Sequence, residues 1–300
     1  MTVNNPHDII LEGDDLLEKM SGLDDKLYNR VIRYLAENSK DGKVSITNEQ
    51  LSGIEDILYD EIKQTDYEKN LKKYLQLFDA IEAAISLEQV ALNGLKAAAI
   101  RELWNGDPLK QVLKNKVIYD LGKDGLKRYF VDGIAQAVRE TSYFNLDIKS
   151  AMDVLKTKLI DDQYTKQYLK NAAMGSLAEY DGAIQDKVRV TYGFHTMVYI
   201  TNTIETSRPV CTHIKDKLGG RISDTDLQKV LDEYCPGGIP NKTDYVPAKR
   251  KVKHKDGSVE FKDVMVPKGS GMVQNTFLEN WSQQCGGHAN GCRHRALWTV

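Results

Sequence analysis

Apolar residues recur at steps of three and four over most of the first 187 residues, and this spacing constrains the chain more than any other feature. Such spacing gathers apolar side chains along one face of each helix. It predicts an all-helical region over residues 1–187, in which residues 1–12 form a mobile arm. A first helix is expected from Asp14, with a stripe formed by Leu16, Met20, Leu23, Leu27 and Val31.

Capping signals predict where the next helices begin. Thr47 and Gln50 have the spacing of a capping box, in which each side chain satisfies a backbone N–H group near the helix start. Residues 65–68 repeat this pattern before a long helix that is expected to run from Asp66 to Arg101. The apolar positions of this helix outnumber those of one narrow seam, so we expect it to expose an apolar stripe to a partner.

The pattern changes near residue 187. Short strands are expected at 188–192 and 196–204, with the end of a helix as the alternative for the second segment. Ser223 is placed to cap a helix that ends at Tyr234. A hairpin is expected around Asp256-Gly257, followed by a closing strand at 298–300. The predicted fold class is a mainly α N-terminal region with a small, loop-rich α+β domain over residues 188–300.

Four potential metal ligands lie within ten positions near the end of the chain, in a glycine-rich segment. Zinc prefers thiolate and imidazole ligands in a tetrahedral arrangement. The favoured set is Cys211, Cys285, His288 and Cys292, with His294 able to replace Cys285. Four protein ligands would close the coordination sphere, so the predicted zinc is structural. Two alternatives stay open: a loop with free thiols, and a disulfide such as Cys211 with Cys292.

The net charge of −2 argues against nucleic-acid binding by the chain as a whole. The predicted hairpin is nevertheless basic. Its lysines have two interpretations: they prevent edge-to-edge aggregation of the strands, or they contact a phosphate backbone. The candidate phosphate contacts are Lys249, Arg250, Lys251, Lys253, Arg293 and Arg295.

Several protein classes are disfavoured by what the sequence lacks. It contains no G-x-S-x-G elbow, P-loop, G-x-G-x-x-G or H-E-x-x-H motif, so we expect neither an enzyme nor a small-molecule substrate. We also expect no secretory signal and no membrane contact, because the first residues lack a basic and an apolar region and no apolar run approaches eighteen residues.

The segments 206–211 and 285–294, together with the region from Asp162 to Val300, resemble the minor head (head-morphogenesis) proteins of tailed bacteriophages, whose type member comes from phage Mu. Those proteins have an Arg-x-x-Cys segment, a glycine a few residues later, and a terminal His/Cys/Arg cluster before a short apolar strand. Trp281 corresponds to an aromatic residue that precedes this cluster, whereas His213 stands where many members have a second cysteine. The matching positions are Arg208, Cys211, Gly219, His288, Cys292, Arg293 and His294.

This resemblance implies a structural minor capsid protein, present in few copies in the virion head near the portal vertex. Its expected partners are the portal protein and inner capsid proteins, with packaged double-stranded DNA as a further candidate. It implies a role in head assembly, genome packaging or delivery, after assembly in the host cytoplasm. The alternative suggested by the basic hairpin beside the Cys/His cluster is a zinc-binding nucleic-acid module.

Overall fold

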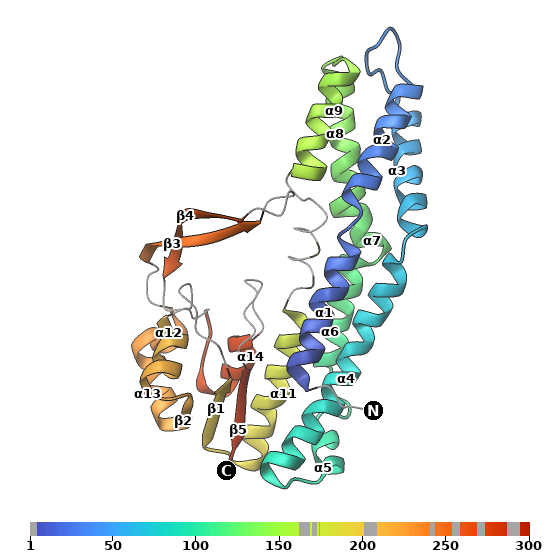
Figure 1. Ribbon diagram of the computed structural model, residues 1–300. Coiled ribbons are helices and arrows are strands. Elements are labelled where there is room, and N and C mark those ends of the chain that lie inside the picture. Colours follow the sequence, from blue (N-terminus) through green and yellow to red (C-terminus); the bar gives the residue numbers. More distant parts are fainter. Residues whose placement is uncertain are drawn as a thin grey trace. The chain divides into compact units, whose positions relative to one another are not determined.

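The computed structural model describes residues 5–161, 169, 173, 175–200, 209–240, 244–253, 259–268, 274–286 and 295–300 (Figure 1). The chain forms two compact units, and each unit is built from two separate stretches of sequence. The first unit comprises Met1–Ile81 and Pro108–Leu177, and the second comprises Glu82–Asp107 and Ala178–Val300. The predicted boundary after residue 187 falls inside a helix, so the structure divides the chain differently.

The described part of the first unit consists of helices and contains no β-strand, as the apolar spacing predicts. Two of its helical segments, η1 and η2, are π-helices. The elements are α1 (Pro6–Met20), α2 (Asp24–Glu37), α3 (Asn48–Lys63), the first part of α4 (Tyr67–Asn93), α6 (Leu109–Leu121), α7 (Lys123–Gly125), η1 (Leu126–Val131), α8 (Asp132–Tyr143), α9 (Ile148–Lys156) and η2 (Thr157–Asp161).

Helix α1 corrects the prediction of a mobile arm. The Asn5 side chain caps this helix by accepting a 3.0 Å hydrogen bond from the backbone N–H of Asp8. Proline at the first helical position suits this start, because its missing N–H would have no helical partner there. Ile9 and Ile10 are both buried. Burial of these apolar side chains holds the segment in a helix, although the local sequence pattern did not predict one there.

The start of α3 confirms the predicted capping box. The Thr47 hydroxyl accepts a 3.2 Å hydrogen bond from the backbone N–H of Gln50, and the Gln50 side chain accepts one of 2.9 Å from the N–H of Thr47. The long helix ends earlier than predicted, at Asn93, because Gly94 adopts a left-handed conformation (φ 65°). The predicted apolar stripe of this helix is buried at its centre, and three of its other apolar residues are exposed: Leu87, Val90 and Leu92.

The second unit combines helices with two small sheets. It contains the end of α4, α5 (Ala97–Glu102), most of α11 (Ser176–Tyr192), β1 (Thr196–Ile200), α12 (Pro209–Thr212), η3 (His213–Lys217), β2 (Arg221–Ser223), α13 (Asp224–Tyr234), η4 (Pro236–Gly238), β3 (Asp244–Lys253), β4 (Val259–Lys268), η5 (Leu278–Asn280), α14 (Trp281–Gly286) and β5 (Arg295–Thr299).

Strands β2, β1 and β5 form an antiparallel sheet in that order, and β3 pairs with β4 as the predicted hairpin (Figure 1). Met197 on β1 lies opposite Trp298 on β5, and both side chains are fully buried. The Ser223 hydroxyl caps α13 as predicted, accepting a 3.1 Å hydrogen bond from the N–H of Asp226. These elements confirm the predicted fold class.

The expected strand at residues 188–192 is wrong, because these residues complete helix α11. Val188 continues a helical stripe with Leu177 and Ile184, and all three side chains are buried. The weak preference of β-branched residues for strands does not outweigh this burial.

Candidate functional site

The predicted zinc ligands are only partly within the described structure. Cys211 lies in α12, where its side chain is buried and accepts a 3.3 Å hydrogen bond from the Tyr199 hydroxyl. Cys285 lies in α14, but its side chain is outside the described residues, as are His288, Cys292 and His294. The zinc set and the alternative disulfide of Cys211 with Cys292 therefore both remain predictions.

Two further candidate ligands in this unit have surroundings that do not favour metal binding. His213 places Nδ1 3.2 Å from the hydroxyl of Tyr234, and the two rings meet edge to face. Burial raises the pKa of the Cys235 thiol, which disfavours the thiolate that a metal requires. Among the described residues, no three His, Cys, Asp or Glu side chains are grouped closely enough to hold a metal ion.

The strand pairing brings residues that flank the two halves of the Cys/His pattern to one end of the sheet. Ile200 at the end of β1 lies opposite Arg295 at the start of β5. Their Cα atoms are therefore about 5 Å apart, the usual separation of paired residues in antiparallel strands. The chain therefore leaves β1 after Ile200 and enters β5 at Arg295 at the same end of the sheet. The two halves of the pattern, about eighty residues apart in sequence, are thus connected to paired residues of one sheet. A metal shared by both halves would require such an arrangement.

Arg295 is the centre of a buried group of charges at the same end of β5. Its Nε and Nη2 atoms donate hydrogen bonds of 2.6 and 2.8 Å to the carboxylate of Asp181 on α11. Its Nη1 and Nη2 atoms each donate a 2.9 Å hydrogen bond to Glu88 on α4. Only 4% of the Arg295 and Asp181 side chains and 17% of the Glu88 side chain are exposed.

This group corrects one predicted nucleic-acid contact. The Arg295 guanidinium is covered and bound to two carboxylates, so it presents no surface to a phosphate. Burial lowers the pKa of Arg295, but the charges and hydrogen bonds of Asp181 and Glu88 outweigh burial and raise that pKa above its usual range. Arg295 therefore serves as a charged anchor that joins the last strand to two helices.

A chain of side-chain amides extends the anchor along β5. Gln185 donates to Glu88, and Gln89 donates to Gln185, over 3.2 and 2.9 Å. Asn93 donates to the carbonyl oxygen of Trp298 over 3.0 Å, and also to Gln89. These contacts satisfy backbone and side-chain polar groups that would otherwise be buried without partners.

Asp186 fixes the helix that leads into the Cys/His segment. Its carboxylate accepts hydrogen bonds of 2.9 and 2.8 Å from the backbone N–H groups of Ser282 and Gln283, at the start of α14. Burial raises the pKa of Asp186 to about 7, although these hydrogen bonds and the charge of Arg189 act in the opposite direction. Gly182 permits the close approach of α11 to α14, because a Cβ there would lie 2.1 Å from the carbonyl oxygen of Ser282.

The remaining candidate nucleic-acid contacts lie mainly on the hairpin. Lys249 is exposed and pairs in register with Asp263, which is exposed as well. Lys251 pairs in register with Phe261, whose side chain is 61% exposed. The side chains of Arg250, Lys251 and Lys253, and the whole of Arg293, lie outside the described residues.

The anchor around Arg295 was not predicted, yet the sequence contains a signal for it. Asp181 falls between Leu177 and Ile184 on a buried helical stripe, and Glu88 follows Ile81 and Ile85 in the same way. A carboxylate within an apolar stripe is rarely buried without a cationic partner. The sequence alone does not identify which of its many arginines and lysines is that partner.

Comparison with known proteins does not place this chain in a family. No protein-family model, curated protein or solved structure matches it. Among the described residues, no helix is both long and apolar enough to cross a membrane.

Proposed function

We propose that this chain is a non-enzymatic, structural minor head component of a tailed-phage virion, placed at or near the portal vertex. The proposal rests on the resemblance of segments 206–211 and 285–294 to the minor head proteins. The observation that supports it best is the pairing of Ile200 with Arg295, two residues that flank these segments: Ile200 precedes the first segment and Arg295 directly follows the second. The short apolar strand that follows the cluster in those proteins corresponds to β5, whose residues are all buried.

A structural zinc ion belongs to the same proposal. It would join Cys211 to the terminal segment through Cys285, His288 and Cys292, or through His294 in place of Cys285. The sheet of β2, β1 and β5 is small, and a metal clip would close a long loop that the short strands hold only at one end. Zinc supplies no reaction here, because four protein ligands leave no open position.

The proposal is tested by co-expression with the portal protein encoded in the same genome. Recovery of both proteins in one complex that survives high salt, and detection of this chain in purified virions, are expected. An empty pull-down together with the absence of the chain from virions would contradict the assignment. The presence of portal, terminase and major capsid genes beside the coding sequence would be an independent check.

The second candidate function is a nucleic-acid-binding module, and the basic hairpin favours it. Strands β3 and β4 form a two-stranded ribbon, a shape that fits the major groove of DNA. Lys249 and Phe261 are exposed on it. Tight binding to duplex DNA that weakens steeply with salt, and that Lys249→Ala reduces, would favour this function over portal docking.

A further inference from the structure

Four helices of the first unit form one closed bundle, which we name the tip section. Helix α2 packs on α3 and α9, and α8 also packs on α3 and α9. Their shared core is fully buried. It includes Leu27, Val31, Ile54, Leu58, Ile134 and Val138.

A second group of helices in this unit, the base section, comprises α1, α4 up to Ile81, and α6. Asp79 on α4 forms ion pairs with Lys110 and Lys114 on α6. Gly13 on α1 lies close to Tyr74 on α4, because a Cβ at Gly13 would meet the Tyr74 ring at 3.3 Å.

The chain leaves α-helical geometry at each described passage between the two sections. A turn at residues 21–23 separates α1 from α2, and a turn at 64–66 separates α3 from α4. Gly122 is extended and ends α6, and the short helix α7 and the π-helix η1 follow before α8. A second π-helix, η2, follows α9 at the end of the tip section.

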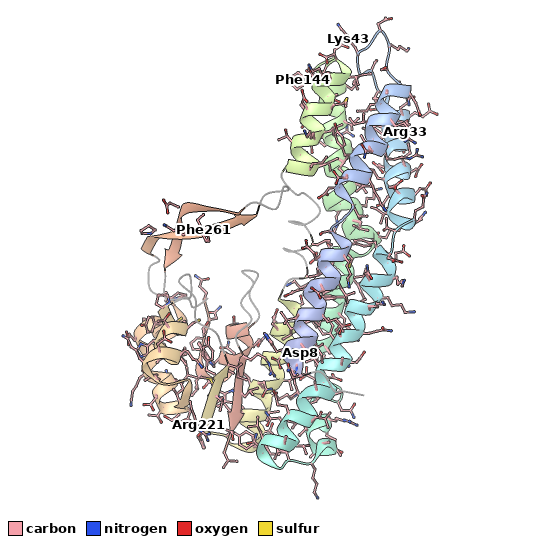
Figure 2. The ribbon with its side chains drawn as sticks, in the orientation of Figure 1. Asp8, Arg33, Lys43, Phe144, Arg221 and Phe261 are labelled. Atoms are coloured by element: carbon pink, nitrogen blue, oxygen red, sulfur yellow. The ribbon has the colours of Figure 1, made fainter. Side chains whose placement is uncertain are left out.

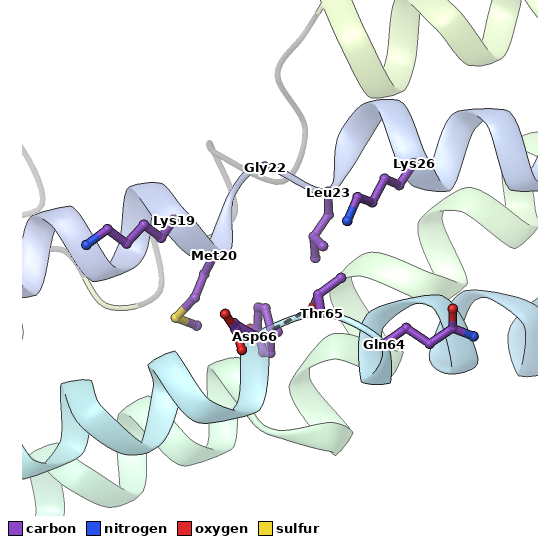
Figure 3. A pocket seen from close by; sticks show the side chains of 9 residues that line it. Lys19, Met20, Gly22, Leu23, Lys26, Gln64, Thr65 and Asp66 are labelled. Carbon is purple, nitrogen blue, oxygen red and sulfur yellow. Dashed lines mark hydrogen bonds between the residues drawn. The ribbon is translucent and has the colours of Figure 1, made fainter.

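Three of these interruptions lie at one level of the unit, which we name the joint (residues 21–23, 64–66 and 121–123). Figure 3 shows the first two facing each other across a cavity of about 390 Å³, with Met20 and Leu23 on one side and Gln64, Thr65 and Asp66 on the other. The third interruption is tied to them by two tyrosines. Tyr67 donates a 3.0 Å hydrogen bond to the carbonyl of Leu121, and Tyr59 donates one of 3.4 Å to that of Lys123.

We infer that the joint is a hinge about which the tip section bends relative to the base section. Bending an uninterrupted helix breaks hydrogen bonds between successive turns, whereas at the joint those ladders are already broken. The cavity is open to solvent on one side, so the space between the two turns is not filled by packed side chains and the sections have room to move. Leu23 in the joint and Met20 directly before it are both buried, and the burial of these apolar side chains favours keeping the sections together as the angle changes.

The bend displaces the far end of the tip section without disturbing either core. That end carries Tyr143 and Phe144, whose rings meet edge to face and whose side chains are 83% and 67% exposed. The loops beside them are fixed, because Val44 donates a 2.9 Å hydrogen bond to Leu146 and Ile148 donates one of 3.2 Å to Gly42. The hinge therefore moves this aromatic pair as part of a rigid body.

The test measures distance distributions in the full chain by pulsed electron paramagnetic resonance. Spin labels are attached to genetically encoded ketone side chains, so that the four native cysteines remain unchanged. Exposed Arg33 and Lys72 report across the joint (Figure 2 labels Arg33), while Arg33 with Gln136 and Glu12 with Lys72 report within the two sections. We expect the cross-joint distribution to be at least about twice as broad as both controls. Equal widths would overturn the inference.

A variant at the joint makes the test specific to these residues. Gly22→Ala fits, because an added Cβ meets only the carbonyl oxygen of Lys19, at 4.0 Å. Alanine favours helix more than glycine, so this change should narrow the cross-joint distribution and leave the controls unchanged. Asn29→Ala, at an exposed position within α2, is the matched control and should have no effect. An unchanged cross-joint width in Gly22→Ala would show that the motion does not occur at this joint, and would overturn the assignment.

Discussion

Replacement of Arg295 by alanine is the most direct test of how the second unit is held together. The change removes four hydrogen bonds and leaves Asp181, 4% exposed, and Glu88, 17% exposed, without their cation. Removing one partner of a buried ion pair costs about 3–5 kcal/mol, because the remaining charge stays away from water. We therefore expect the second unit to lose about that much of its free energy of unfolding. With a urea dependence of about 2 kcal/mol per M, the midpoint should fall by about 1.5–2.5 M.

The three tryptophans allow this loss to be measured for one unit. Trp104, Trp281 and Trp298 all belong to the second unit and are buried, so their fluorescence follows its unfolding in urea. Lys229→Ala is the matched control: it breaks an ion pair with Asp226 whose side chains are 71% and 47% exposed, and should cost at most about 0.5 kcal/mol.

A double variant separates the cost of an unpaired charge from the loss of packing. Adding Asp181→Ala to Arg295→Ala removes one of the stranded carboxylates, so the double variant should be more stable than additivity of the two single changes predicts. If Arg295→Ala costs no more than Lys229→Ala, the buried anchor does not stabilise the unit and the reasoning is refuted.

Three further predictions concern the same unit. Burial raises the pKa of Asp186 from 3.8 to about 7, so the folded state holds this proton more tightly than the unfolded state. The contribution of Asp186 to stability should be fully present below the unfolded pKa of 3.8, should be lost as the pH rises from there through about 7, by up to about 4 kcal/mol, and should not change further above that. Asp186→Asn should flatten this slope in urea titrations followed by fluorescence. Gly182→Ala should lower the melting temperature, because the new Cβ would lie 2.1 Å from the carbonyl oxygen of Ser282. A melting curve identical to that of the unmodified chain would contradict the packing described for α14. If zinc is bound, metal analysis should give one equivalent per chain. Cys292→Ser or a chelator should then make residues 188–300 sensitive to protease while the first unit stays resistant. Protein without zinc, together with unchanged protease resistance of the Cys292→Ser variant, would leave the free-thiol alternative.

Local signals in the sequence predicted those elements whose determinants lie within a few residues of one another. The capping residues Thr47 and Ser223 have their partners three positions away, and the hairpin is specified by a short turn sequence between two strand-forming runs. Residues 188–192 were misassigned because their alternation resembles a strand, while the burial of Val188 that favours a helix depends on distant residues.

The candidate site depends even more on contacts between residues that are distant in the sequence. The closing strand was expected, but its anchor joins Arg295 to Glu88 and Asp181, residues that are 207 and 114 positions away. Many cations in the sequence could satisfy these carboxylates, and only the folded chain selects one. The zinc set is defined by residue type and spacing alone, so it stays a prediction.

The interleaved composition of the two units has a consequence for the order in which the chain folds during synthesis. Glu88 is translated 207 residues before Arg295, an interval of about 10–40 s at usual elongation rates. The first unit can close once residue 177 has left the ribosome, whereas the second must wait for β5. Until then the binding surface for β5 on α4 and α11 is open to water, and another copy of the strand or a chaperone could occupy it. A ribosome that stalls before residue 295 would therefore leave a folded first unit joined to an unfinished second one.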